Sequence, residues 1–116
     1  MIEKQIRISS FDVLPNGTVK PSALLRHMQQ AAREDCDAMG CTYPYMREQN
    51  TVFVLIRLAL QLNRPIFDGE TLTLRTFNNR IDGLYFDREY FFLSEDGEAA
   101  RCSSFWVLMR YDTRRP

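Results

Sequence analysis

One segment of this sequence carries a long helical pattern, and nearly every segment that follows it alternates as a β-strand does. Between residues 22 and 39 the apolar side chains recur at helical spacing: Leu24, Leu25, Met28, Ala31, Ala32, Cys36 and Met39. Pro21 suits the first position of a helix, where its missing N–H leaves no bond unmade. Gly40 is typical of the residue just past a helix end. The pattern predicts a single helix of about five turns.

Five strands are expected around that helix. Before it, Ile2, Ile6 and Ile8 alternate with polar residues, as in a strand with one buried face. After it, the sequence indicates strand alone, over 51–63, 71–77, 84–93 and 99–111. In the first of these segments every even position from Val52 to Leu62 is apolar. The turn sequences "RPIFDGE", "RIDG" and "SEDGE" separate the segments. The expected order is one strand, one helix and then four strands in hairpins or meanders.

A long helix and an antiparallel sheet have a natural packing arrangement in a chain of this size. The five strands curl, and the helix lies along the concave face, covered on nearly all sides. This is the α+β hotdog fold, and we expect residues 1–116 to form a single hotdog domain. Because the outer strand of such a sheet is unpaired, we also expect a second copy to pair with it edge to edge, giving a homodimer.

Composition disfavours several classes of function. The chain has 15 basic and 15 acidic residues and a formal net charge of zero, so nothing favours nucleic acid as a partner. No apolar run is long enough to span a membrane, and no signal-peptide pattern follows Met1. The spacing of Cys36, Cys41 and Cys102 fits no zinc site and suits a reducing cytoplasm. We therefore expect a cytoplasmic protein that needs no metal or other cofactor.

The strand segments also resemble a known family, the amino-terminal hotdog half of acyl-acyl-carrier-protein thioesterases. The likeness covers nearly the whole chain and depends on the order and spacing of several short motifs. In the strand region these are Arg57, Arg64-Pro65, Gly69-Glu70, Thr76-Phe77, Ser103-Ser104, Trp106-Val107 and Thr113 to Pro116. The family has Trp where this chain has Phe77. In the helix, Gln29, Ala32 and Gly40 also match.

The resemblance implies a thioesterase-family protein of fatty acid biosynthesis, with thioesters of acyl carrier protein or coenzyme A as substrates. Enzymes of this family are similar to two hotdogs in one polypeptide. The second half carries their Asp, Asn and His catalytic residues, and the first half contributes mainly to the acyl-chain pocket. The chain is then either a homodimeric thioester hydrolase or a non-catalytic acyl-binding or structural half-domain. A hotdog dehydratase is disfavoured, because no usable pair of His and carboxylate is evident.

Thioester hydrolysis requires a polarised carbonyl and an activated water or nucleophile. The free N–H groups of Ser22 and Ala23 at the helix start would hold the carbonyl oxygen. In the preceding loop, one hotdog pattern places a catalytic Asp before Gly-His-Val-Asn-Asn. This chain offers Asp12, but Thr18 replaces the His and Lys20 replaces an Asn. Asp12 is therefore either the base or a turn-initiating residue.

The loop and the middle of the helix supply further candidates for substrate binding. Asn16, Gly17 and Thr18 form a candidate binding loop, although Asn-Gly is also ordinary turn chemistry. Gln29 and Gln30 stand where another hotdog pattern carries Glu or Asp. Their amides can orient a water but cannot take its proton.

Asp35 is the second candidate base, because it falls within the apolar stripe, four residues from both Ala31 and Met39. A carboxylate in apolar surroundings would have a raised pKa and could accept a proton. The alternative is a structural carboxylate that reaches water or bonds a neighbouring strand. His27, the only histidine, is expected at the surface or an interface, and Cys36 has no evident basic partner.

Arg57 lies in the middle of its strand and would meet either a phosphopantetheine group of the substrate or a carboxylate in an edge ion pair. Six aromatic side chains on the strands would wall an acyl tunnel or, as is usual for strand aromatics, mostly belong to the core. These are Phe53, Phe77, Tyr85, Phe86, Phe91 and Trp106.

Overall fold

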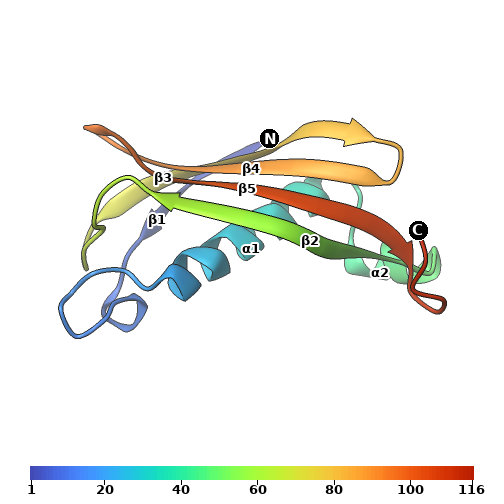
Figure 1. The fold of residues 1–116 in the computed structure, drawn as a ribbon, viewed down its shortest axis with the longest axis horizontal. Helices are drawn as coiled ribbons and strands as arrows, with labels where there is room; N and C mark the ends of the chain where they lie inside the picture. Colours follow the sequence, from blue (N-terminus) through green and yellow to red (C-terminus); the bar gives the residue numbers. More distant parts are fainter.

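The computed structural model describes residues 1–116 in full. The chain forms one five-stranded antiparallel sheet with strand order β1-β3-β4-β5-β2, together with one long and one short helix (Figure 1). The elements are β1 (Ile2–Arg7), the 3₁₀ turn η1 (Ser10–Asp12), α1 (Pro21–Ala38), α2 (Tyr43–Glu48), β2 (Thr51–Leu62), β3 (Thr71–Asp82), β4 (Tyr85–Ser94) and β5 (Gly97–Arg110). The predicted strand, helix and four strands are confirmed, and α2 is an addition to them.

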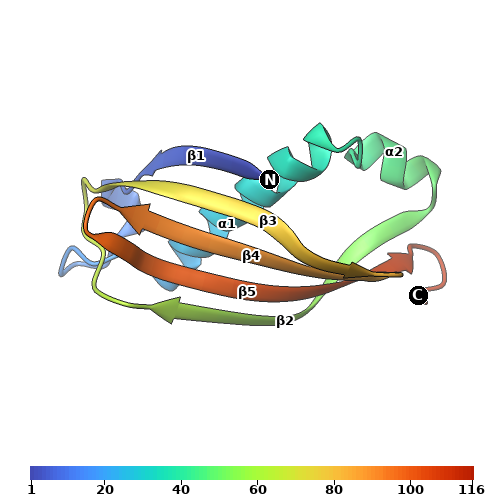
Figure 2. The same ribbon diagram turned by 90° about the horizontal axis from the view of Figure 1, so that it is seen from above.

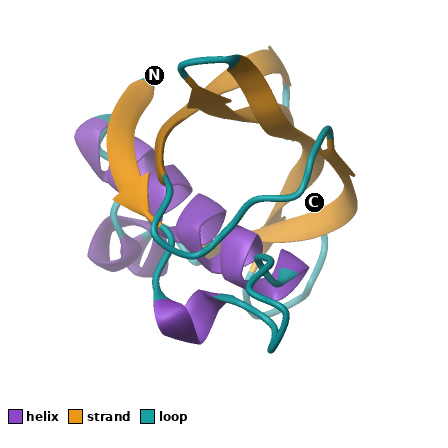
Figure 3. Ribbon diagram, turned by 90° about the vertical axis from the view of Figure 1, so that its left-hand side faces the viewer, coloured by secondary structure: helices purple, strands orange, loops and turns teal.

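Helix α1 lies along the concave face of the curled sheet, as predicted (Figures 1 and 3). It packs against β3 and β1. The side that faces the sheet is buried at Ala23, Leu24, Met28, Ala31 and Asp35. The expectation that the helix is covered on nearly all sides is wrong, because the opposite side of α1 is exposed along its whole length.

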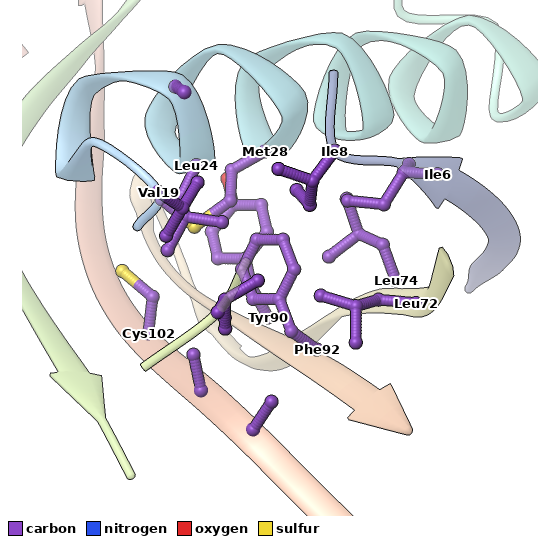
Figure 4. Packing of buried hydrophobic residues seen from close by; sticks show 14 of the residues in the cluster. Ile6, Ile8, Val19, Leu24, Met28, Leu72, Leu74, Tyr90, Phe92 and Cys102 are labelled. Atoms are coloured by element: carbon purple, nitrogen blue, oxygen red, sulfur yellow. The ribbon is translucent and has the colours of Figure 1, made fainter. Parts of the chain in front are cut away.

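The core lies between this helix and one half of the sheet (Figure 4). Small side chains on the helix let its backbone approach the strands closely, which is why Ala23 and Ala31 are completely buried. The 15 residues of the cluster are Ile6, Ile8, Val19, Ala23, Leu24, Met28, Ala31, Ile66, Leu72, Leu74, Tyr90, Phe92, Ala99, Ala100 and Cys102. They come from α1, from β1, β3, β4 and β5, and from the loops beside the start of α1, and the candidate site lies next to this packed region.

The ends of α1 follow the predicted signals, whereas α2 was not expected. Pro21 begins α1, and Gly40 follows its end with a φ of +87°, which favours glycine. Helix α2 is only six residues long, too short to produce a periodic pattern. The Thr42 hydroxyl accepts a hydrogen bond from the Tyr45 N–H at 3.3 Å and caps this helix. Neither helix combines the length and apolarity needed to cross a membrane.

Strand β2 lies at one edge of the sheet and pairs with β5 rather than with β3, which follows it in sequence (Figure 2). A register shift between Leu55 and Arg57 leaves Ile56 as a bulge that is 56% exposed. The bulge exchanges the two faces of the strand, so the simple alternation predicted from Val52 to Leu62 is wrong. Leu55, not Val54, shares a face with Leu58.

Strands β3 and β4 are joined by a tighter turn than the sequence indicated. The segment "RIDG" was expected to be the turn, but β3 continues through Asp82 and only Gly83 and Leu84 connect it to β4. Gly83 has a φ of +62°, as two-residue hairpin turns require. The longer β3 brings Ile81 opposite Phe86 and extends the sheet beyond the helix-covered core.

Candidate functional site

The register of the sheet arranges the residues of its concave face in successive rows across the strands, because directly opposed residues share a face. The row inside the core is Thr76, Tyr90, Cys102 and Leu60, from β3, β4, β5 and β2. The next row is Asn78, Arg88, Ser104 and Leu58. The row after that is Ile81, Phe86, Trp106 and Leu55. The face thus changes from buried apolar to polar and then to apolar again.

The outer row and Phe53, which lies two residues before Leu55 on the same face of β2, form an accessible apolar surface. We call this surface the aromatic end and define it as Phe53, Leu55, Ile81, Phe86 and Trp106. The rings of Phe53 and Phe86 meet edge to face, with centroids 4.9 Å apart. Phe86 and Trp106 are half-buried, whereas Leu55 is 41% and Ile81 is 58% exposed. Apolar side chains gathered on a concave face and left accessible are typical of a ligand or partner site.

Three of the six aromatic candidates lie on the opposite, convex face of the sheet. Phe77 stacks on Phe91 with centroids 6.0 Å apart, and Tyr85 stacks on Phe105 at 5.7 Å. These rings cannot line a tunnel beneath the helix. The expectation that most of the six belong to the core is also wrong, because the core aromatics are Tyr90 and Phe92. Only Phe53, Phe86 and Trp106 lie on the concave face.

The polar row is organised by Arg88, which sequence reasoning missed. Its Nη1 donates hydrogen bonds to Asp35 Oδ2 at 2.9 Å and to Thr76 Oγ1 at 3.1 Å. Its Nη2 donates to Asn78 Oδ1 at 2.9 Å and lies 3.9 Å from Cys36 Sγ. The segment "YFDREYFFL" did contain a signal. Arg88 occupies the same alternate positions of the strand as Phe86, Tyr90 and Phe92, so it faces inward with them and needs a buried partner.

Asp35 does not lie in apolar surroundings, so the physical reason given for its choice as a base is wrong. It is buried, and its Oδ1 lies 3.2 Å from the amino group of Met1 while Oδ2 binds Arg88. The structure thus shows the bond to a neighbouring strand that was the alternative.

Cys36 does have a basic neighbour, the guanidinium of Arg88. Burial is nevertheless the largest effect on the Cys36 thiol and raises its pKa. A thiolate is therefore disfavoured at Cys36.

Asp12, the other candidate base, is buried beside the start of α1. The Ser9 N–H and the Ser9 hydroxyl both donate to Asp12 Oδ2 at 3.0 Å. His27 Nε2 lies 3.5 Å from the same oxygen, and Arg26 Nη2 lies 3.7 Å from Oδ1. Burial alone would raise the pKa of Asp12, but the hydrogen bonds from Ser9 and the contact with His27 outweigh it and lower the pKa below 3.8. His27 thus contacts a carboxylate, which the sequence did not indicate.

The loop before α1 is held as a compact turn. Asn16 Oδ1 accepts hydrogen bonds from the Thr18 N–H at 3.1 Å and from its hydroxyl at 2.7 Å. Gly17 has a φ of +86°, and its carbonyl accepts from the Asp68 N–H at 3.1 Å. The polar groups of Asn16 and Thr18 therefore satisfy one another, and a substrate-binding role for Asn16, Gly17 and Thr18 stays a prediction.

The start of α1 offers fewer free donors than expected. Ala23 is completely buried, and its N–H donates to the Lys20 carbonyl at 3.0 Å, so the prediction of a free N–H there is wrong. The N–H of Ser22 has no backbone partner. Gln29 and Gln30 are exposed on the outer side of α1, where the Gln30 amide donates to Glu34 at 3.0 Å.

The site candidates fall into separate groups. Asp12 and Ser22 lie near the start of α1, whereas Asp35 lies in its last turns. Asp35 follows His27 by eight residues, which is about 12 Å along the helix axis.

Arg57 lies on the convex face, opposite Phe105 of β5, and its guanidinium lies 5.3 Å from the centre of that ring. It has no carboxylate partner, so the expected edge ion pair is wrong. No cluster of three or more His, Cys, Asp or Glu side chains could hold a metal ion.

The sequence as a whole matches the acyl-ACP thioesterase N-terminal domain over residues 1–116. The chain belongs to the acyl-ACP thioesterase family. No curated protein matches it.

Two of the family motifs, Arg64-Pro65 and Gly69-Glu70, have a clear structural role. Arg64 and Glu70 form a two-point ion pair, with N–O distances of 2.9 and 3.1 Å, that closes the segment between β2 and β3.

Solved structures share the hotdog fold of this acyl-ACP thioesterase domain. An acyl-ACP thioesterase from Bacteroides thetaiotaomicron is 25% identical with a TM-score of 0.90, over 98% of this chain and 47% of that chain. A putative oleoyl thioesterase from Lactobacillus plantarum is 24% identical with a TM-score of 0.91, over 97% and 44%. A DHNA-CoA thioesterase from Staphylococcus aureus is 18% identical with a TM-score of 0.86, over 98% and 77%. The chain spans a little under half of the first two proteins.

Proposed function

We propose that this chain is the acyl-binding hotdog of an acyl-ACP thioesterase and acts in fatty acid biosynthesis on fatty acyl thioesters. The observation that carries the proposal is the aromatic end, where Phe53, Phe86 and Trp106 leave an apolar surface open on the concave face. A fatty acyl chain is apolar and slender, so it gains free energy by leaving water for such a surface. Family membership supports the same substrate class.

The partners we propose are a thioester carrier and a second hotdog. The carrier is acyl carrier protein or coenzyme A. The second hotdog is either another copy of this chain or a further domain, and the unpaired edge of β2 supports this association because exposed strand edges favour pairing. Three free cysteines fit a cytoplasmic location, which we also propose.

A second candidate function is hydrolysis by a homodimer of this chain alone. The observation that favours it is the contact between Asp12 Oδ2 and His27 Nε2, because a carboxylate that orients an imidazole is a common way to prepare a general base. The free N–H of Ser22 would then hold the thioester oxygen. Asp35 is the weaker base in this scheme, since it must first release Arg88.

The experiment that tests both candidates is thiol release by the purified chain from acyl-carrier-protein and acyl-coenzyme A thioesters, from short to long acyl chains. Turnover that falls in Asp12→Asn and His27→Ala, with Asp35→Asn compared in parallel, would support the self-contained hydrolase. Binding of the thioesters without turnover would support the acyl-binding role. A folded chain that neither binds nor hydrolyses any of them would contradict both.

A further inference from the structure

The concave face of the sheet changes character within one residue row, from the aromatic end to a buried polar cluster. We name this cluster the polar wall and define it as Asp35, Thr76, Asn78, Arg88 and Ser104. We propose that the polar wall is the end stop of the acyl site and limits the length of the acyl chain that the protein accepts. This inference rests on the acyl-binding role proposed above.

The members of the polar wall are hydrogen-bonded to one another, and all but the half-buried Asn78 are buried, so displacing them with an apolar chain would cost much free energy. Arg88 bonds α1 through Asp35 and β3 through Thr76 and Asn78. The Ser104 hydroxyl donates to the Arg88 carbonyl at 2.9 Å, and no buried polar side-chain atom of the molecule lacks a hydrogen-bond partner. Separating these groups would leave a charge unpaired in a dry interior, which is strongly unfavourable.

Behind the polar wall there is no room for a longer chain. The next rows hold Tyr90 and Phe92 on β4 and Leu74 on β3, and all three are 2% exposed or less. They pack against Leu24 and Met28 of α1 in the closed core (Figure 4). Interiors packed at this density accept an additional methylene only with strain.

The aromatic end is joined directly to the polar wall. The Trp106 indole N–H donates to Ser104 Oγ at 2.8 Å, and Phe86 lies two residues before Arg88 on the same face of β4. The end of α1 near the polar wall is partly accessible to solvent, since Cys36 is partly buried and Met39 is 53% exposed. An acyl chain that lies on the aromatic end would therefore meet the polar wall at its inner limit.

Trp106 is the only tryptophan, so its fluorescence reports the aromatic end alone. We would titrate the intact chain with saturated fatty acids of increasing length. Affinity should rise about fourfold for each added methylene and then stop rising at a defined length. Bromine on the tail carbon of a fatty acid of that length should quench Trp106 more strongly than bromine beside the carboxyl group, because the tail reaches the wall next to Trp106.

The variant that tests the end stop is the double substitution Asp35→Ala with Arg88→Ala, which removes both charges and also frees the volume of the Arg88 side chain. The fourfold increments should continue to longer acids in this variant and stop only at the closed core of Tyr90 and Phe92. The matched control makes the same two changes in the exposed pair on the other face, Asp82→Ala with Arg80→Ala, and should keep the wild-type limit. If the wall variant fails to fold, the comparison of the two bromine positions on the wild-type chain still tests whether the acyl tail ends at the polar wall.

Each outcome has one meaning. Affinity that rises through every length tested, or equal quenching from both bromine positions, would overturn the polar wall as an end stop while leaving acyl binding in place. No response of Trp106 to any fatty acid would overturn the acyl-binding surface itself. Trp106 emission that changes on dilution of the protein and not with fatty acid would assign the aromatic end to a second hotdog and overturn both.

Discussion

Arg88 Nη1 and Asp35 Oδ2 lie 2.9 Å apart in the interior and join strand β4 to helix α1. Both side chains are at most 5% exposed. The pair fixes the last turns of the helix over the sheet at the point where the closed core ends and the aromatic end begins. A single buried contact therefore both orients the helix and divides the concave face into two parts.

Removal of one member of this pair should destabilise the protein more than removal of both. Arg88→Met leaves the carboxylate of Asp35 buried with only the Met1 amino group nearby, and we expect a loss of about 3–5 kcal/mol in the free energy of unfolding. The double variant with Asp35→Leu should lie within about 1 kcal/mol of wild type or be more stable. Urea unfolding measures both, and additive losses would contradict the prediction. Arg80→Met, in an exposed pair, should cost less than about 1 kcal/mol.

The sequence was sufficient for features that depend on local pattern, and insufficient for those set by distant contacts. Helix α1, its ends at Pro21 and Gly40, and all five strands could be predicted, because periodicity and capping act over a few residues. The Arg88–Asp35 bond joins residues 53 positions apart, so no local pattern reports it. The bulge at Ile56 escaped prediction for a related reason: the register of β2 is set by its partner β5.

The arrangement of the candidate site could not be predicted from the sequence. The two candidate bases, Asp12 and Asp35, are both buried, and their role as bases stays a prediction. Their partners, His27 and Arg88, were not recognised, because a bond between side chains depends on how the elements pack. The sequence also could not tell which strand aromatics face the helix, since a bulge or a longer turn exchanges the two faces of a strand.

Acid should weaken the protein partly through Asp12. Its pKa is lowered in the fold, so its stabilising contribution is complete above the unfolded value near 3.8 and is lost as the pH falls through the folded pKa. Asp12→Asn should therefore be less stable than wild type at neutral pH, and the difference should shrink below about pH 4. Urea unfolding across this pH range measures the effect. Asp68→Asn, at an exposed position, is the control for the loss of a surface carboxylate and should change the free energy of unfolding by less than about 0.5 kcal/mol at neutral pH.

The ion pair of Arg64 and Glu70 should stabilise the connection between β2 and β3. Glu70 also accepts the Phe67 N–H at 2.7 Å, and its hydrogen bond to Arg64 is the main reason that its pKa is lowered. Glu70→Gln keeps the shape but removes the charge, and we expect a loss of about 2 kcal/mol in the free energy of unfolding. Glu95→Gln in the exposed β4–β5 turn should change stability by less than about 0.5 kcal/mol. Equal effects at the two positions would contradict a structural role for the motif.

Cys102 should be inert in the folded protein although its thiol is free. Burial is the largest effect on this thiol and raises its pKa to about 11, so only about one molecule in 10⁴ carries the reactive thiolate at neutral pH. Alkylation followed by peptide mass spectrometry should modify Cys41, which is less buried, well before Cys102. In guanidinium chloride the two rates should become similar, because unfolding removes the burial that separates them. Rapid modification of Cys102 under native conditions would mean that β5 opens locally beside the core, and the closed half of the concave face would then not be closed.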